Sequence, residues 1–180
     1  MISSSNQQEL LLRLSETAFQ GNNDIPSGDS LLVIDADHAA RQTMARLLTG
    51  EGYQVRTAES GDSALSQLRE SLSDLVLITI ASLGPDPFEL LRAIRRQFPE
   101  PLLPVIVIAD STQSSSEVTA FRAGASDFLT QPFEAEILLT RIALRLQHRL
   151  TYAELQQSQQ RYALVAQGAQ TGLWELDILR

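Results

Sequence analysis

The 180-residue sequence contains no cysteine and no lysine, so all 14 of its basic residues are arginine. Without cysteine there is no disulfide framework, no thiolate nucleophile and no cysteine zinc site. Without lysine there is no Schiff base and no Walker phosphate loop, because both need a lysine amino group. The two histidines, His38 and His148, are too few for a histidine metal cluster. These absences restrict metal chemistry to oxygen ligands.

Long apolar runs and an excess of positive charge are also missing. No apolar run approaches the ~20 residues that span a membrane, and we expect no membrane insertion. The net charge of -8 and the scattered arginines argue against nucleic acid as a partner. The segment Met1–Gln8 lacks the charged and apolar regions of a signal peptide, so we expect a cytoplasmic protein.

From residue 31 onward, short apolar runs alternate with amphipathic helical patterns. The apolar runs predict strands at Leu31–Ile34, Tyr53–Thr57, Leu75–Ile80, Val105–Ala109 and Ser126–Leu129. The intervening patterns predict helices at Arg41–Leu48, Ser63–Leu72, Phe88–Phe98 and Ser115–Ala123. This alternation is typical of a doubly wound α/β domain with a five-stranded parallel sheet, whose site lies at the carboxyl ends of the strands.

Two segments flank this core. Residues 1–29 form a polar leader with a short predicted helix at Glu9–Phe19. After the core at 30–133, a long helical pattern starts near Glu134 and meets no glycine or proline until Gly168. The alternation over Gly172–Leu179 predicts a strand, so we divide the chain at 134–168 and 169–180 and interpret the last segment as the start of a further domain.

The long helix contains an apolar seam and an arginine stripe. Its leucine, isoleucine and alanine residues follow a three-four spacing that suggests packing against another helix. The stripe beside it could form a solvated face, but arginines next to leucines suit an interface better than open water. We interpret it as a candidate homodimer face, and the helix that follows it is the alternative location for the dimer. The residues of this face are Leu139, Arg141, Ile142, Arg145, Leu146 and Arg149.

Several segments together make the chain similar to the receiver domain of two-component response regulators. The segments are LLVIDADHAAR, YQVRTAESGDSALSQL, DLVLITIASLGPDPFELLRAIRR, LPVIVIAD and GASDFLTQPF. The resemblance implies a flavodoxin-like sheet of strand order 2-1-3-4-5, with an additional helix at the amino end and an extended helix at the carboxyl end. It also implies dimerisation through the fourth helix, fifth strand and fifth helix, which is common in such domains.

The resemblance implies a phosphorylation site that this sequence has lost in most positions. In such receivers a histidine kinase phosphorylates an aspartate after the third strand, aided by a Mg²⁺-binding acidic pair, a hydroxyl residue and a lysine. The matching positions hold Asp35 and Ala36 for the acidic pair, Thr79 for the acceptor, Ala109 for the hydroxyl residue and Gln131 for the lysine. A threonine is a poor nucleophile without an adjacent base, and Thr79 suits strand packing better.

Other positions have structural interpretations. Asp37 is expected to cap the first helix of the core, and Asp86, between two prolines, is expected in a turn. Phe128 occupies the family's aromatic switch position, and we interpret it as fixed packing because Ala109 removes its partner. The Gln131–Pro132 step matches a Lys-Pro bond that is commonly cis in the family.

The leading hypothesis is a pseudo-receiver: a non-enzymatic module for dimerisation and docking of other signalling proteins, with no cofactor and no metal. The segment SQQRYALVAQGAQTGLWELDI resembles the opening of a PAS domain, in an order common in cyclic-di-GMP proteins with GGDEF and EAL domains, such as those of the FimX type. One alternative is a receiver of a two-component phosphorelay that is phosphorylated at Asp35 or Thr79. Another is a small-ligand sensor, disfavoured because the pocket lacks a glycine-rich loop and basic donors.

Overall fold

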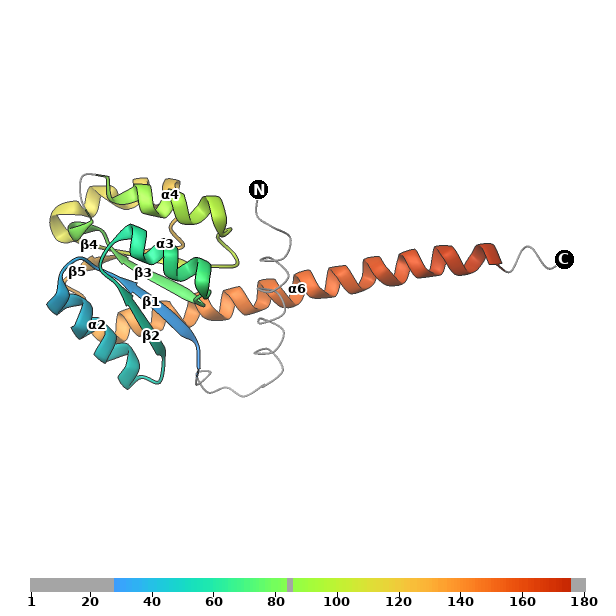
Figure 1. The fold of residues 1–180 in the computed structure, drawn as a ribbon, viewed down its shortest axis with the longest axis horizontal. Coiled ribbons are helices and arrows are strands. Elements are labelled where there is room, and N and C mark those ends of the chain that lie inside the picture. The colour runs from blue at the N-terminus through green and yellow to red at the C-terminus, as the bar shows by residue number, and fades with distance from the viewer. Residues whose placement is uncertain (1–27, 84–85, 176–180) are drawn as a thin grey trace.

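The computed structural model describes residues 28–83 and 86–175 (Figure 1). A five-stranded parallel sheet forms its centre, with the strand order β2-β1-β3-β4-β5. The strands are β1 (Ser30–Ile34), β2 (Gln54–Ala58), β3 (Leu75–Thr79), β4 (Val105–Asp110) and β5 (Asp127–Gln131). The predicted strand order and flavodoxin-like fold class are confirmed. The predicted helix at Glu9–Phe19 lies outside the described residues.

Five α-helices and two short 3-10 helices connect and cover the strands. They are α2 (His38–Gly50), α3 (Gly61–Glu70), η1 (Ile80–Ser82), α4 (Pro87–Gln97), η2 (Ser111–Ser116), α5 (Glu117–Ala123) and α6 (Ala135–Glu175). Asp37 caps α2 as predicted, since its carboxylate accepts a hydrogen bond from the Ala40 N–H at 2.8 Å. Asp86 caps α4 in the same way through the Phe88 N–H.

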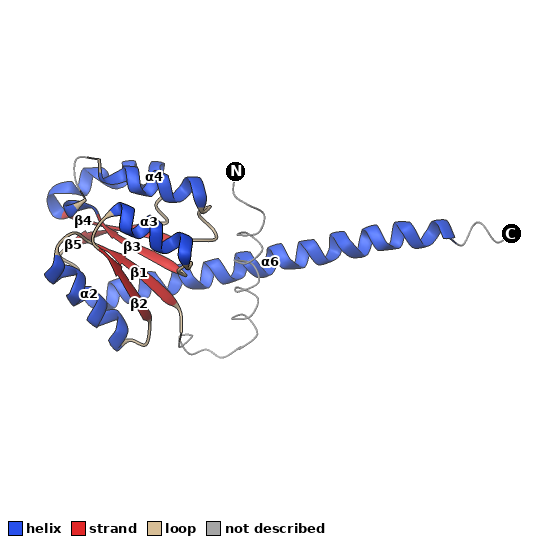
Figure 2. Cartoon of the chain, in the orientation of Figure 1, coloured by secondary structure: helices blue, strands red, loops and turns tan. Residues whose placement is uncertain are grey.

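The helices form two layers, one on each face of the sheet (Figure 2). Helices α2 and α6 cover one face, where Leu48 and Leu138 pack against alternate strand residues such as Val33. Helices α3, α4 and α5 cover the other face, where Leu68 and Ile94 lie in a second core. Because both faces are covered, the central strands are apolar along their whole length, as expected for a parallel sheet.

Helix α6 is longer than the sequence pattern predicted. It contains 41 residues, which corresponds to about 60 Å, and it projects far beyond the sheet (Figure 1). It continues through Gly168 and Gly172 to Glu175, so the predicted strand at Gly172–Leu179 is wrong over residues 172–175, and 176–179 lie outside the described residues. A helix satisfies its backbone hydrogen bonds internally, whereas a strand needs a neighbouring strand.

The apolar seam of α6 packs within its own domain. Ile142 and Leu146 are buried in the core that α6 forms with α2 and the sheet, and Leu139 packs at its edge. Ala153 and Leu150 continue the seam against Leu102 at the amino end of the sheet. The prediction that this seam receives another helix is therefore wrong, because the sheet already covers it.

The arginine stripe beside the seam also has partners within the chain. Arg141 and Arg145 form ion pairs with Asp127 of β5, at 2.7 and 3.2 Å. Arg149 is buried and pairs with Asp74 at 2.6 Å. Arg149 therefore cannot contribute to a dimer face in this arrangement, and Arg141 and Arg145 remain partly exposed.

Candidate functional site

Four polar residues meet at the carboxyl edge of the sheet. Each lies two positions beyond a strand residue whose side chain is buried on the α2 and α6 face, so strand alternation directs all four toward that side. Because the strands are parallel, their carboxyl ends share one edge. The four residues are Asp35, Thr79, Asp110 and Gln131.

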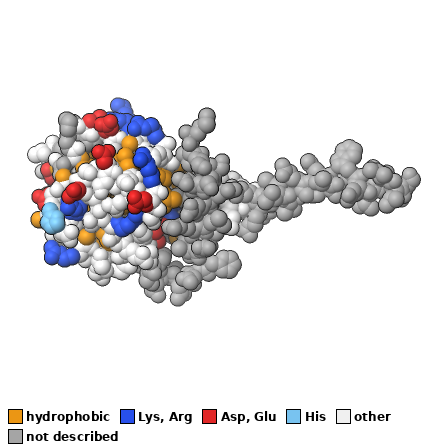
Figure 3. Space-filling model, viewed as in Figure 1, with side chains coloured by type: hydrophobic (Ala, Val, Ile, Leu, Met, Phe, Trp, Pro, Cys, Tyr) orange, Lys and Arg blue, Asp and Glu red, His pale blue; other side chains and the backbone are white. Residues whose placement is uncertain are grey.

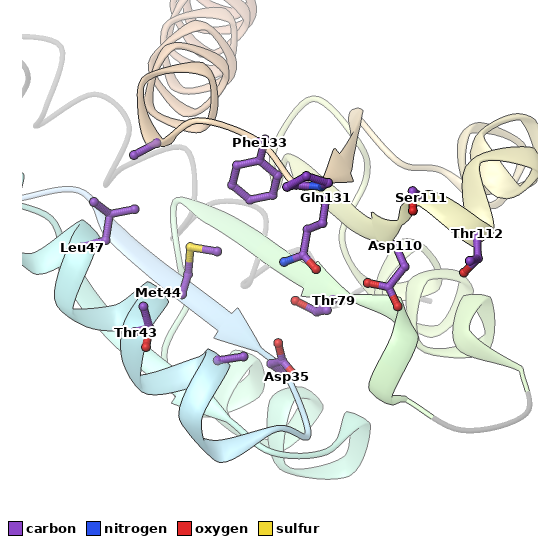
Figure 4. A pocket seen from close by; sticks show the side chains of 13 residues that line it. Asp35, Thr43, Met44, Leu47, Thr79, Asp110, Ser111, Thr112, Gln131 and Phe133 are labelled. Carbon is purple, nitrogen blue, oxygen red and sulfur yellow. The ribbon is translucent and has the colours of Figure 1, made fainter.

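These residues line a pocket of about 760 Å³ between α2 and the connection from β5 to α6. Figure 4 shows the Gln131 amide and the Asp110 carboxylate directed toward Thr79, with Asp35 on the side nearest α2. The remaining wall comes from α2, from η2 and from the segment after Pro132. Its members are Ala40, Thr43, Met44, Leu47, Ser111, Thr112, Pro132, Phe133 and Ala135.

Asp35 is held in place by its local backbone. Only 4% of its surface is exposed, and its carboxylate accepts a hydrogen bond from the Asp37 N–H at 2.9 Å. The guanidinium of Arg41 donates to the backbone carbonyl of Asp35 at 2.5 Å and, more weakly, to that of Ala36. The first turn of α2 therefore fixes the loop that follows β1.

Two of the predicted pocket positions do not line the pocket. Ala36 is exposed in the loop after β1, and Ala109 is fully buried on the opposite face of the sheet. Phe128 lies in the same opposite core with 6% of its surface exposed, in agreement with the packing interpretation. The Gln131–Pro132 peptide bond is cis, as the resemblance suggested.

Asp110 is the site residue that the sequence analysis missed. Matching the chain to the family directed attention to Ala109, the preceding residue of β4. Strand alternation would have found Asp110, because it lies two positions after Ile108, which pairs with Thr79 in the sheet. The family pattern has an acid at the end of the third strand and a hydroxyl residue at the end of the fourth. In this chain the hydroxyl group of Thr79 is on β3 and the acid, Asp110, is on β4.

The donor set does not match the Mg²⁺ site that the family implies. Ala36 and Thr79 hold no carboxylate, so Asp35 alone remains of the family's three acids. Within residues 28–83 and 86–175, no group of three or more histidine, aspartate or glutamate side chains could hold a metal ion. Across the same ranges, no helix is both long and apolar enough to cross a bilayer.

The strand order, the two helical layers and the pocket at the carboxyl edge define a flavodoxin-like α/β domain of the kind that serves as a module in signalling proteins. The sequence profile of the response regulator receiver domain matches residues 31–143. The chain therefore belongs to the response regulator receiver domain family.

Similar proteins include regulators from several bacteria. The chain is 35% identical over 113 residues to the transcriptional regulatory protein AfsQ1 of Streptomyces coelicolor, covering 63% of this chain and 49% of that protein. It is 30% identical over 127 residues to the response regulator PleD of Caulobacter vibrioides, covering 71% and 28%. The chain thus spans half or less of the length of these relatives.

Solved structures show the same similarity. The crystal structure of the receiver domain of NtrX from Brucella abortus has a TM-score of 0.60 and 34% identity, covering 65% of this chain and 98% of that one. A longer structure of NtrX from the same organism, in complex with ADP, has a TM-score of 0.69 and 32% identity, covering 76% of this chain and 30% of that one.

Proposed function

We propose that this receiver domain is a pseudo-receiver, which acts as a dimerisation and docking module without aspartyl phosphorylation. The observation that carries the proposal is the threonine at the end of β3, where the family pattern has its acceptor aspartate. A threonine hydroxyl needs an adjacent base to act as a nucleophile, and the described pocket lining offers the weakly basic carboxylates of Asp35 and Asp110 but no histidine.

The missing positive charge supports the same proposal. Phosphoryl transfer develops negative charge on the transferring group, and receivers neutralise it with a metal ion and a lysine. Gln131 replaces that lysine, and the described lining residues include no basic side chain. Asp35 and Asp110 would instead repel the incoming phosphoryl group.

Intact-mass measurement after incubation with acetyl phosphate and Mg²⁺ tests this proposal. We expect no added phosphoryl group, whereas a receiver that retains the acceptor aspartate, treated in parallel, gains one. A phosphoryl group on Asp35, Thr79 or Asp110, located by peptide mapping, would reject the pseudo-receiver and favour the phosphorelay alternative.

We also propose a homodimer, which forms through exposed residues of α6 and not through its buried apolar seam. Ile137 and Leu144 of α6 are 45% and 56% exposed, and Val118 and Phe121 of α5 are 59% and 44% exposed. The two helices flank β5 on opposite faces of the sheet, and an apolar centre with partly exposed arginines at its margin, such as Arg141, suits an interface.

Light scattering across a concentration series tests the dimer. Leu144→Asp should shift the protein toward the monomer, whereas Leu155→Asp, which changes an exposed leucine on the projecting part of α6, should not. A shift with Leu155→Asp alone would place the dimer on the projecting part of α6 instead. Equal dimerisation of wild type and Leu144→Asp would contradict the proposed interface, and a monomeric wild type would contradict the homodimer itself.

The proposed partners are other signalling proteins in the cytoplasm. On the face shown in Figure 3, acidic and basic side chains are interspersed, in contrast to the continuous basic surface that nucleic acid requires. We further propose that α6 transmits the output to a PAS domain followed by GGDEF and EAL domains, as the resemblance of the tail implies. Reading the gene beyond the codon for Arg180 tests this order directly.

A further inference from the structure

The pocket at the carboxyl edge has the charge of a cation site. Its polar groups are the carboxylates of Asp35 and Asp110, the amide of Gln131, and the hydroxyls of Thr43, Thr79, Ser111 and Thr112. The lining residues that the structure describes include no arginine and no histidine. Phosphates and nucleotides are anions, so this lining disfavours them, while it attracts a ligand with a positive charge.

The apolar part of the pocket wall favours an organic cation over a metal ion. Met44 and Leu47 of α2 face Phe133 across the pocket (Figure 4), and Pro132, the residue before Phe133, also lines it. A hydrated metal ion gains nothing from such a wall and requires several oxygen ligands in a close shell. An organic cation with an apolar arm gains from both parts of the pocket.

The polar part and the apolar part of the pocket wall lie at different positions along the groove. Asp35, Thr79 and Asp110 lie at the strand ends, whereas Leu47 lies near the far end of α2, two turns beyond Ala40, which also lines the pocket. The pocket volume of about 760 Å³ falls within the range of small-molecule sites. A ligand with a charged head and an extended apolar arm would therefore lie along the groove between α2 and the β5–α6 connection.

We propose that this pocket binds a small primary amine. The ammonium group would donate hydrogen bonds to Asp35 and Asp110, and the apolar arm would lie between α2 and Phe133. Each carboxylate has about four acceptor positions, so partners already present at Asp35, such as the Asp37 N–H, do not exclude a hydrogen bond from a ligand. Asp35 is already fixed by its backbone contacts, so binding costs little ordering at that side chain.

The position of the pocket couples such a ligand to the output helix. The ligand would contact α2 and Ala135, the first residue of α6, at the same time. Binding would then stabilise the packing of α6 on the domain by mass action. This inference is independent of the pseudo-receiver proposal, because the ligand would need no phosphoryl chemistry.

Amide NMR titrations of the full chain test the inference with three compounds that share a six-carbon arm. Hexylamine carries the positive charge, 1-hexanol is neutral, and hexanoate is negative. We expect hexylamine to shift the resonances of residues around Asp35, Asp110 and Phe133 in a saturable manner. Hexanol should bind about tenfold more weakly or not detectably, and hexanoate should not bind, because each charge-assisted hydrogen bond contributes about a factor of ten or more.

Two variants test whether the Asp110 carboxylate binds the ammonium group of the ligand. Asp110→Asn should weaken hexylamine binding about tenfold. Glu134→Gln removes the same charge from an exposed residue near the pocket that does not line it, and it should leave binding nearly unchanged.

Three results would overturn the assignment: equal binding of hexylamine and hexanol, no saturable shift with hexylamine at millimolar concentration, or equal weakening by the two variants. A titration with MgCl₂ that shifts the same resonances while hexylamine does not would assign the pocket to a divalent ion instead.

Discussion

The two edges of the sheet differ in their charged residues, although Arg41 binds backbone carbonyls at the carboxyl edge as other arginines do at the amino edge. At the carboxyl edge, two acids line an open pocket whose described lining residues include no basic side chain. At the amino edge, arginines reach the segments that precede β3, β4 and β5 and bind their carbonyls or acids. The comparison indicates that this chain uses its arginines to hold the sheet to its helices, while its site lacks the positive charge that the family pattern places there.

Arg149 connects α6 to the amino edge. It is 5% exposed, pairs with Asp74 at 2.6 Å, and donates from Nε to the Leu102 carbonyl at 3.1 Å. Asp74 also accepts a hydrogen bond from the Ser30 N–H at 2.6 Å. One side chain thus links α6, the segment before β3 and the segment before β4, and it does so just before α6 leaves the domain.

Arg95 of α4 performs the same task on the opposite face. It donates to the carbonyls of Gly124 and Leu103 at 2.5 and 2.7 Å, and more weakly to the Ser126 hydroxyl. Burial lowers the pKa of Arg95 to about 10. The nearby carboxylate of Glu100 acts in the opposite direction and partly offsets this decrease. The guanidinium therefore remains charged at neutral pH.

Of the changes proposed here, removal of the Arg149 side chain should lower the unfolding free energy most. Arg149→Ala leaves Asp74 and the Leu102 carbonyl without this partner, and losing one member of such a pair costs about 3 kcal/mol of unfolding free energy. Urea denaturation monitored by circular dichroism measures the loss. Arg141→Ala is the control, since its side chain is 40% exposed, and it should cost about 1 kcal/mol or less. Equal losses would show that burial does not distinguish the two pairs.

A methyl group at Gly124 should displace the side chain of Arg95, which packs against this glycine. Gly124 has a φ of +104°, and a Cβ there would lie 2.6 Å from Cγ of Arg95. Gly124→Ala should therefore cost about 2 kcal/mol, from backbone strain and displacement of the arginine. Gly50→Ala is the matched control, because it has open space and no positive φ, and it should be neutral or slightly stabilising. A neutral Gly124→Ala would contradict a role for this close contact.

An aspartate in place of Thr79 tests whether the carboxyl edge tolerates a further negative charge without a metal ion. Thr79→Asp adds a third carboxylate beside Asp35 and Asp110 and should lower the unfolding free energy by about 1.5 kcal/mol in the absence of divalent ions. Millimolar Mg²⁺ should restore this stability in the variant and leave wild type unchanged. Thr79→Asn has a similar shape without the charge, so an equal loss in that variant would assign the effect to packing.

Sequence patterns predicted the sheet well because its information is local. Runs of branched apolar residues identify buried parallel strands, and Asp37 precedes a helix in the usual capping position. The partner of an amphipathic face is not local information. The spacing of Ile142 and Leu146 is the same whether they pack on a sheet or on another helix, and the acid that Arg149 binds, Asp74, is 75 residues away in the chain.

The pocket was predicted in part for a related reason. Family matching assigns Asp35, Thr79 and Gln131 by position, and the structure brings these three together. It could not find Asp110, because the family pattern places no functional group there. Strand alternation is a physical rule that does not depend on the family, and it identifies the side on which each residue of β4 lies.

The smallest expected effect is a gain in stability at the amino edge. Asp29 is 5% exposed, and its Oδ2 has no hydrogen-bond partner among the described residues. Burial, with a further contribution from Asp74, raises the pKa of Asp29 from 3.8 to about 6, although Arg149 acts in the opposite direction. The folded state therefore binds this proton more tightly than the unfolded state, and the contribution of Asp29 to stability falls as the pH rises from about 4 to about 6.

Asp29→Asn removes this titration, so it should raise the unfolding free energy by about 1 kcal/mol at pH 7.5 and have little effect near pH 4. Urea denaturation of both proteins at the two pH values provides the test. Asp62→Asn, a change of the same type at a residue in the first turn of α3, serves as the control for the change in net charge. A gain that is the same at both pH values would show that the amide acts through a new hydrogen bond, and a loss at pH 7.5 would show that the Asp29 carboxylate stabilises the amino edge.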